Sequence, residues 1–343
     1  MQTRYDLDVV ATRGPLVESR HRVHAAVVHA TAGMRAVAGD PSTVSCWRSC
    51  AKPLQVMPFV ASGHFDDLGW GTNELALACA SHGGEPEHVT IARAMLRDIG
   101  LEEGDLACGA HDPLTRRGAR LAQESGEQIT RLHNNCSGKH AAMLALARGQ
   151  QWPVRGYEQS VHPVQTAILR TIARWTGIAA ERIEQVVDGC GVVAFGLPLE
   201  AMALAFSRLA ADACVGGELS SRIFGAMRAH PFLIGGTDRF DTVLLEETGG
   251  RVIAKVGAEG IHSVAIPEES LGIAVKVEDG SARAQYPAVL HLLQLLKILP
   301  GDLSPRLERF LHTPLHNTRG AVVGEIRPAL GVSVTGVPVA ELR

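Results

Sequence analysis

A serine and a lysine stand three residues apart in this sequence, at Ser49 and Lys52, and Pro53 follows the lysine directly. Positions i and i+3 of a helix share a face, so a hydroxyl and an amine come within hydrogen-bonding reach there. Serine is a weak nucleophile until a neighbouring base takes its proton, and lysine is such a base when burial or a nearby cation lowers its pKa. The alternative is that Ser49 caps a helix N-terminus, the commonest role of serine at such a position.

Two further reactive side chains stand beside glycines. Ser81 ends an apolar helix just before Gly83 and Gly84. Lys255 stands near the end of a predicted strand, before a glycine turn whose backbone could offer an N–H group to an oxyanion. The corresponding structural interpretations are a helix C-terminal turn for Ser81 and a surface lysine on a hairpin for Lys255, so the spacing leaves both roles open.

Two loops set cysteines beside charged residues. Cys136 and Lys139 lie one turn apart at a predicted helix start, where the pKa of a cysteine is depressed. Cys190 lies between two glycines and follows Asp188 by two residues. Cys136 and Cys190 could bind zinc, although no C-x-x-C pair occurs in the chain. The alternative is a buried cysteine with a solvated lysine, the usual environment of each residue type.

The elements that must position these residues follow from the hydrophobic periodicity. Strands are predicted at 7–13, 22–30 and 34–38, with a hairpin turn at 31–33, and again at 251–256, 261–266, 271–277 and 320–326. The region from about 50 to 230 is predicted as helices, at about 73–80, 86–98, 114–125, 157–175, 199–212 and 217–229, with another ending at Gly149. Two more helices are predicted at about 286–298 and 303–312. Proline fits only the first turn of a helix, so one helix should begin near Ser49 or Cys50.

Strands from both ends of the chain therefore flank a helical block, which predicts an α/β (α+β) fold. Its centre is one mixed or mostly antiparallel sheet built from both chain ends, with the helices as a lobe beside it. We expect a single catalytic unit over 1–343, with a sheet lobe at about 1–48 and 231–343 and a helical lobe at about 49–230. A cleft between the lobes is the natural site, and Ser49 lies where strands give way to helices.

Composition excludes several classes of protein. Hydrophobic residues make up 46% of the 343 residues and charged residues 20%, as in a soluble globular enzyme. The net charge of −3 gives no basic surface for nucleic acid or an anionic membrane, and no apolar run is long enough to span a bilayer. Seven cysteines without a secretory signal predict a reduced, cytoplasmic protein.

Seven blocks together resemble the asparaginase II family, the rhizobial-type, thermolabile L-asparaginases, which are unrelated to the threonine-dependent bacterial enzymes. They occur in the family order over nearly the whole chain, and the blocks at 133–140 and 188–191 are the most specific. The blocks lie at 48–55 (RSCAKPLQ), 80–89, 108–113, 133–140 (HNNCSGKH), 162–163, 188–191 (DGCG) and 255–260 (KVGAEG). The resemblance implies a fold like that of serine β-lactamases and glutaminases, in agreement with the sheet and helical lobe predicted above.

The resemblance also implies roles for individual residues. Ser49 with Lys52 would be one Ser–Lys pair, and Ser81 with Lys255 a second that faces it. Cys136, Lys139 and Cys190 would hold a zinc ion, with no organic cofactor. The residues implied around the amino-acid pocket are Arg48, Asn135, His140 and Asp188.

Three positions depart from the family pattern. Gly83 stands where the family usually has serine, and Val193 where proline is common. Asp241 replaces a further cysteine that some members have near the metal. A carboxylate in place of that cysteine suits zinc less well than a third thiolate would.

The implied function is hydrolysis of L-asparagine to L-aspartate and ammonia through a Ser–Lys acyl-enzyme, by a cytoplasmic homodimer. Lys52 would be the base for Ser49, while Ser81 and Lys255 would protonate the leaving ammonia. One alternative is a zinc hydrolase in which Cys136, Cys190 and a third ligand activate water. Another is a non-catalytic protein that binds a small amino acid on the same scaffold. The blocks at 133–140 and 188–191 argue against an acyl transferase or a β-lactam hydrolase.

Overall fold

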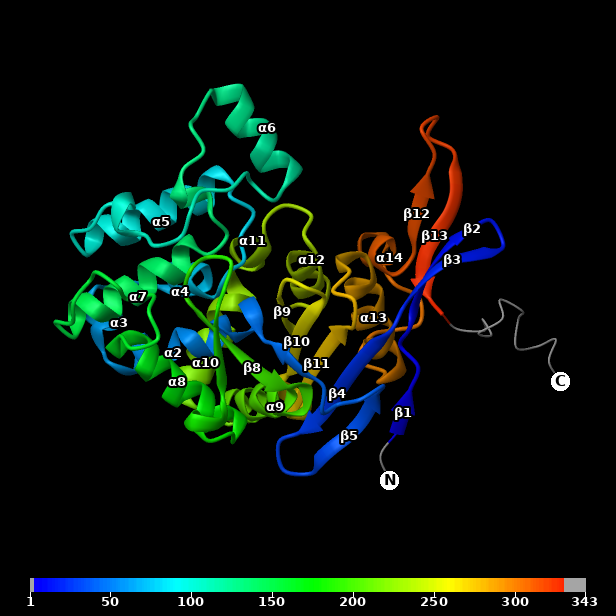
Figure 1. Cartoon of the computed structure of the whole chain (residues 1–343), viewed down its shortest axis with the longest axis horizontal. Helices are drawn as coiled ribbons and strands as arrows, with labels where there is room; N and C mark the ends of the chain where they lie inside the picture. The colour runs from blue at the N-terminus through cyan, green and yellow to red at the C-terminus, as the bar shows by residue number, and fades with distance from the viewer. Residues whose placement is uncertain (1–2, 330–343) are drawn as a thin grey trace.

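The computed structural model of the chain describes residues 3–329. Its centre is a six-stranded sheet in the order β1-β5-β4-β11-β10-β9 (Figure 1). All neighbours in this sheet are antiparallel except β1 and β5, which are parallel. Its strands are β1 (Thr3–Tyr5), β4 (Val23–His29), β5 (Gly33–Ala38), β9 (Ile253–Val256), β10 (Ile261–Ile266) and β11 (Leu271–Val277). Strands from both ends of the chain thus share one mostly antiparallel sheet, as predicted.

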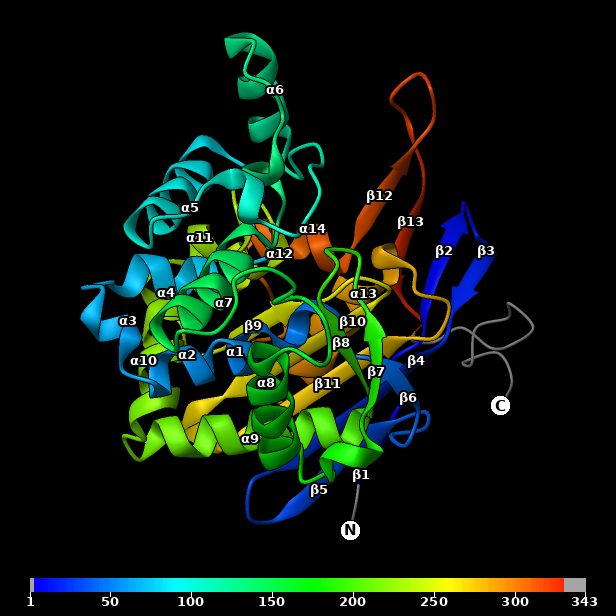
Figure 2. The ribbon, with the colours of Figure 1, turned by 60° about the vertical axis from the view of Figure 1, so that its left-hand side comes forward.

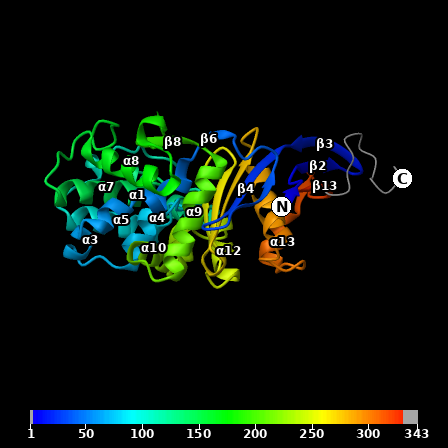
Figure 3. The same ribbon diagram turned by 90° about the horizontal axis from the view of Figure 1, so that it is seen from below.

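The middle of this sheet is buried on both faces, which explains its continuous apolar strands. β4 and β11 pair over seven successive positions, and nearly all their side chains are buried. One face lies against α9 (Leu199–Cys214), and the other against α12 (Phe240–Glu247) and α13 (Ala282–Leu295) (Figures 1 and 3). A Cβ atom on Gly272 of β11 would lie 2.1 Å from the Ala203 carbonyl oxygen, so α9 can approach this strand only because the residue is glycine.

Two smaller sheets lie outside the central one. The first has the order β12-β13-β2-β3 and the second the order β6-β8-β7. Their strands are β2 (Val9–Arg13), β3 (Leu16–His21), β6 (Val44–Cys46), β7 (Glu184–Val187), β8 (Val193–Pro198), β12 (Thr313–His316) and β13 (Val322–Pro328). The prediction of a single sheet is therefore wrong for the strands predicted at 7–13 and 320–326, because these form β2 and β13, which pair with each other outside the central sheet. β7 and β8 also correct the prediction that 50–230 is helical throughout.

Helices form a thick layer on the α9 side of the sheet (Figure 2). They are α1 (Lys52–Gln55), α2 (Met57–Ala61), α3 (His64–Asp67), α4 (Thr72–Cys79), α5 (Pro86–Asp98), α6 (Arg116–Ser125), α7 (Ser137–Gly149), α8 (Pro163–Thr176), α10 (Glu218–Ala229) and α11 (Pro231–Gly235). α14 (Pro305–Leu311) packs beside α13. Within residues 3–329, no helix combines the length and the apolar character that crossing a membrane requires.

Candidate active site

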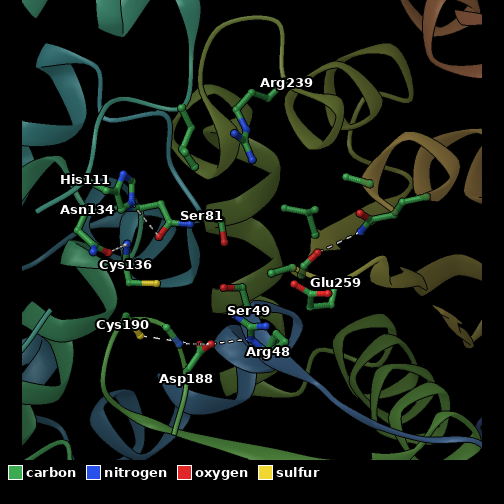
Figure 4. Close-up of a pocket in the computed structure, with 18 of the residues that line it drawn as sticks. Arg48, Ser49, Ser81, His111, Asn134, Cys136, Asp188, Cys190, Arg239 and Glu259 are labelled. Atoms are coloured by element: carbon green, nitrogen blue, oxygen red, sulfur yellow. Dashed lines mark hydrogen bonds and ion pairs between the residues drawn. The ribbon is translucent and has the colours of Figure 1, made fainter. Parts of the chain in front are cut away.

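A cavity of about 410 Å³ opens between the helical layer and the edge of the central sheet. That volume suits a small-molecule ligand. The loop before α1, the loops after α4 and β7, and the β9–β10 turn all contribute to its wall. Ser49, Ser81, Cys136 and Cys190 line it, together with charged side chains that Figure 4 labels. Segments far apart in the chain thus meet at one small pocket.

Ser49 lies on a tight turn that leads into α1. The preceding residue, Arg48, has a left-handed φ of 48°, which is uncommon for a residue with a side chain and marks local backbone strain. A 3₁₀ turn over Arg48–Ala51 then runs into α1, where Pro53 occupies the first turn as predicted. Lys52 is helical, with φ −56° and ψ −40°, although it precedes proline. Ser49 lies inside the 3₁₀ turn, so it does not cap a helix.

Several backbone N–H groups of cavity-lining residues have no acceptor within residues 3–329. They include the N–H of Ser49, in the first turn of its helix, and that of Ala258, in the β9–β10 turn. Both residues line the cavity. Unpaired N–H groups that face a cavity can stabilise an oxyanion, so the two donors suit a reaction that develops negative charge on a carbonyl oxygen.

Ser81 is the meeting point of two buried lysines. Its Oγ accepts hydrogen bonds from Lys255 Nζ at 2.7 Å and from Lys52 Nζ at 3.1 Å. Both lysines are fully buried and Ser81 is 2% exposed. The N–H of Ser81 donates to the Ile234 carbonyl at 3.0 Å, which holds the serine against α11. Ser81 and Lys255 therefore pair as the resemblance implies, and Lys52 joins this pair instead of pairing with Ser49.

Lys52 bonds to Ser81 and not to Ser49. Its amine also donates to the carbonyl oxygens of Ala80 and, at 3.2 Å, Asn135. No hydrogen bond between Ser49 Oγ and Lys52 Nζ occurs within the described residues. Helical spacing brings Lys52 to the correct side of its turn, but packing directs the amine to the loop after α4.

The environment of Lys255 makes its proton easier to remove than that of an ordinary lysine. Burial, together with the positive charge of Lys52, lowers its pKa to about 8. The carboxylate of Asp241 opposes this shift and raises the Lys255 pKa. A lysine that titrates near neutral pH is suited to acid–base catalysis.

Asp241 does not join the cysteines, contrary to the expectation that it takes the place of a cysteine near the metal. Its Oδ2 accepts a hydrogen bond from the Val256 N–H at 2.7 Å, and its Oδ1 lies 3.0 Å from His262 Nε2. Burial raises the Asp241 pKa, but the neighbouring His262 and Lys255 outweigh it and hold the pKa at about 2. Asp241 is therefore an anion that anchors the strand carrying Lys255.

Arg48 and Asp188 form an ion pair at the cavity wall, with 2.6 Å between Arg48 Nε and Asp188 Oδ1 (Figure 4). Burial raises the Asp188 pKa, but Lys139 and Arg48 together bring it below its usual value. The Gly189 N–H also donates to Asp188 at 2.8 Å. Each charge thus has a partner inside the protein before any ligand binds.

Cys136, Lys139 and Cys190 lie together, as the sequence predicts for metal ligands. Lys139 Nζ is 3.0 Å from Cys190 Sγ. The hydrogen bond from the Cys136 thiol, assisted by Lys139, lowers the Cys190 pKa to about 5, so Cys190 is the first of the two thiols to ionise. Two thiols are ligands that zinc prefers. Burial lowers the Lys139 pKa, but Cys136 and Cys190 outweigh it and raise the pKa, so the amine would join the thiols around a metal only after losing its proton. Within residues 3–329, no group of three or more His, Cys, Asp or Glu side chains is placed to hold a metal ion.

His140 and Asn135, both predicted around the amino-acid pocket, differ in whether they line the cavity. His140 is fully buried, its Nδ1 is 2.6 Å from the Tyr157 hydroxyl, and it is not among the residues that line the cavity. Burial lowers the His140 pKa to about 3. Asn135 does line the cavity, and its N–H donates to His111 Nε2 at 2.9 Å. Of the two, only Asn135 is placed to meet a ligand.

Several cavity residues were not among the predicted site residues. Glu259 stands in the 255–260 block and Arg239 stands two residues before Asp241, but neither had a role that spacing could indicate. Their positions became informative only in the folded chain. The others with polar side chains are His111, Asn134, Gln285 and Tyr286.

Comparison with known proteins gives a family whose sequence profile covers nearly the whole chain. The sequence profile of the L-asparaginase II family matches residues 9–328. A search among curated proteins finds no match.

Solved structures similar to this chain share little sequence with it. The native form of Mglu is 13% identical, with a TM-score of 0.47 over 82% of this chain and 66% of the other, so this chain spans about two thirds of that protein. A probable glutaminase from Bacillus subtilis in complex with 6-diazo-5-oxo-L-norleucine is 12% identical, with a TM-score of 0.39 over 81% and 85%. A β-lactamase from Mycobacterium bovis is 14% identical, with a TM-score of 0.40 over 81% and 95%.

Proposed function

The chain belongs to the L-asparaginase II family of amidohydrolases, and we propose that its reaction is the hydrolysis of L-asparagine to L-aspartate and ammonia. The observation that carries this proposal is the Ser81 hydroxyl, shared by two buried lysine amines at a cavity that Ser49 also lines. Amide hydrolysis needs a nucleophile, a route for its proton and a donor for the leaving nitrogen. The cavity holds a group suited to each of these tasks.

Ser49 is the nucleophile in this proposal. It lines the cavity, it is only half-buried, and its Oγ is not engaged by another described side chain. Its Oγ attacks the side-chain amide carbon of the substrate while its proton leaves toward the lysines. The N–H groups of Ser49 and Ala258 receive the oxyanion; loss of one such donor costs about a hundredfold or more in rate.

Ser81 and the two lysines carry the proton in this proposal. Lys255, with its lowered pKa, accepts it through the Ser81 hydroxyl, and Lys52 remains hydrogen-bonded to two carbonyl oxygens nearby. The same relay returns the proton to the amide nitrogen, so that the C–N bond breaks and ammonia leaves. A water molecule then attacks the aspartyl ester, Ser49 recovers its proton, and L-aspartate is released.

A zinc ion, when bound by Cys136, Lys139 and Cys190, would supply positive charge at the cavity wall and order the pocket. The Cys190 pKa of about 5 makes a thiolate ready there. The chain's own residues perform the acyl transfer, since serine already supplies the nucleophile. Hydrolysis by metal-activated water is the alternative reaction, and the serine variants below separate the two.

Ammonia release from L-asparagine and from L-glutamine tests the proposal. Ser49→Ala should abolish turnover and leave thermal unfolding unchanged, since Ser49 Oγ makes no hydrogen bond within residues 3–329. Ser81→Ala should also remove activity, whereas the exposed control Ser125→Ala should retain it. Mass spectrometry after reaction with a diazo ketone analogue of asparagine should find the label on Ser49. Wild-type rates from Ser49→Ala, or a label on Ser81, would contradict the assignment of the nucleophile.

A further inference from the structure

One cation of the cavity has no partner inside the protein. Within residues 3–329, the Arg239 guanidinium makes no hydrogen bond and no ion pair, although it lines the cavity and is half-buried. Figure 4 shows its side chain extending into the cavity from the side away from Ser49 and Arg48. A guanidinium presents a planar fork of donors that matches a carboxylate. Arg48, by contrast, already has Asp188 as its partner.

One anion of the cavity is also unpaired. The Glu259 carboxylate lines the cavity and, within the described residues, makes no ion pair and accepts no hydrogen bond. Its charge raises the pKa values of Arg48 and Lys276, and Lys276 Nζ donates to the backbone carbonyl of Glu259, not to its carboxylate, at 2.8 Å. Arg239, on the other side, is close enough to Lys255 and His82 for its charge to affect both. Within the described residues, Arg239 and Glu259 make no ion pair with each other, so each can meet a ligand group of opposite charge in the one cavity.

The backbone at Glu259 is held in an unfavourable conformation. Its φ is 61°, and the next residue, Gly260, has a φ of 67°. Consecutive left-handed residues in a hairpin turn favour Asn-Gly or Gly-Gly, because a side chain such as glutamate adds steric cost. Strain of this kind concentrates at binding and active sites. Glutamate in place of asparagine thus points to a use for the carboxylate.

We propose that Arg239 and Glu259 recognise the two charges of a free amino acid, Arg239 binding its α-carboxylate and Glu259 its α-ammonium group. This inference rests on the proposed function, whose substrate is the ω-amide of a free L-α-amino acid, and names two residues that determine specificity for it. Ser49 and the Ser81 hydroxyl then face the side-chain amide. An asparagine within a peptide lacks both charges, so the cavity rejects it by leaving Arg239 and Glu259 desolvated and unpaired.

The test compares variants against substrates that lack one charge each. The substrates are L-asparagine, its α-methyl ester and N-acetyl-L-asparagine, and the readout is kcat/KM for ammonia release. Arg239→Gln should lower kcat/KM for L-asparagine by about ten- to hundredfold, the value of a charged hydrogen bond, and leave that for the ester nearly unchanged. Glu259→Gln should lower it for L-asparagine and leave that for the N-acetyl compound nearly unchanged. The exposed controls Arg35→Gln and Glu268→Gln should behave as the wild type.

Glu259→Asn separates substrate binding from a purely structural role of Glu259, because the two roles predict different combined changes in Tm and KM. Asparagine relieves the left-handed strain, so Tm should rise while KM for L-asparagine also rises. Equal losses on all three substrates, or a fall in Tm with an unchanged KM, would overturn the inference.

Calorimetric titration with L-aspartate separates this inference from the reaction itself. If the wild type binds L-aspartate and releases no ammonia from either amide, the proposed reaction is wrong. The inference then stands if Arg239→Gln and Glu259→Gln each weaken that binding by about tenfold or more, and falls if they do not.

Discussion

The Ser81 Oγ and the Lys255 Nζ lie 2.7 Å apart, although 174 residues separate them along the chain. Lys52 Nζ lies 3.1 Å from the same oxygen, although in the sequence Lys52 follows a different serine, Ser49, by three residues. Burying two amines around one hydroxyl costs free energy, because each charged amine loses its hydration and also repels the other. Such an arrangement indicates that the charges serve a function. The predictions that follow examine this centre and the structure that supports it.

The rate should rise with pH as Lys255 loses its proton. Because burial and Lys52 lower its pKa to about 8, kcat/KM for L-asparagine should climb to a plateau with a midpoint near pH 8. Asp241 raises this pKa, so Asp241→Asn should move the midpoint to lower pH. Rate profiles of both proteins between pH 6 and 10 measure the shift. A midpoint that stays in place in a variant with native circular dichroism would show that Lys255 does not control the rate.

Gly138 allows α7 to lie directly on α4. A Cβ atom there would be 2.4 Å from the Leu77 carbonyl oxygen, so Gly138→Ala should destabilise the protein by about 1–3 kcal/mol. Helix propensity alone predicts the opposite sign, a gain of up to about 1 kcal/mol. Gly225→Ala in α10 is the matched control, since a Cβ there meets nothing within 4 Å, and it should stabilise. Urea unfolding of the two variants measures both effects, and equal signs would refute the packing argument.

Buried histidines should make the fold sensitive to acid. Burial lowers the pKa of His140 to about 3, and it also lowers the pKa values of His82 and His88. In the unfolded chain these groups bind protons below about pH 6.5, so the unfolded state gains protons that the folded state does not. The contribution of these neutral histidines to the free energy of unfolding is therefore fully present above about pH 6.5, and it is lost as the pH is lowered toward 3.

His140→Asn isolates the contribution of one such group. Its unfolding free energy should depend on pH less steeply than that of the wild type, by about 1.4 kcal/mol per pH unit between pH 6 and 4. Urea titrations at several pH values measure the slopes. The exposed His316→Gln serves as the control and should keep the wild-type slope; the same slope in His140→Asn would contradict the assignment.

Metal content tests the proposed ligands directly. The purified protein should contain about one zinc ion per chain, as a site with three protein ligands holds. Cys190→Ser and Lys139→Met should lose most of it, while the exposed Cys214→Ser should retain it. Elemental analysis with thermal unfolding, before and after a chelator, measures occupancy and its effect on Tm. Because serine supplies the nucleophile, part of the asparagine turnover should survive chelation; complete and reversible loss would favour metal-activated water instead.

Local patterns determined a large part of this fold. The apolar runs at 261–266 and 271–277 match β10 and β11, and Pro86 and Gly149 bound their helices where predicted. These features depend on residues close in sequence, through side-chain periodicity and the backbone limits of proline and glycine. Strand pairing depends on contacts between distant segments, so the same patterns could not tell that β13 joins β2 or that the exposed β7 is a strand.

The sequence by itself determined which residue types are available for chemistry: Ser49 and Ser81, two lysines, and the Cys136–Cys190 loops. Only the tertiary structure decided their partners. It directs Lys52 to Ser81, turns His140 to Tyr157, and pairs Asp241 with His262. The physical reason is that hydrogen bonds and ion pairs act over a few ångströms, and packing of distant segments decides which groups come that close. Among the residues that the structure describes, the same packing leaves the Arg239 guanidinium at the cavity without a hydrogen-bonding or ionic partner.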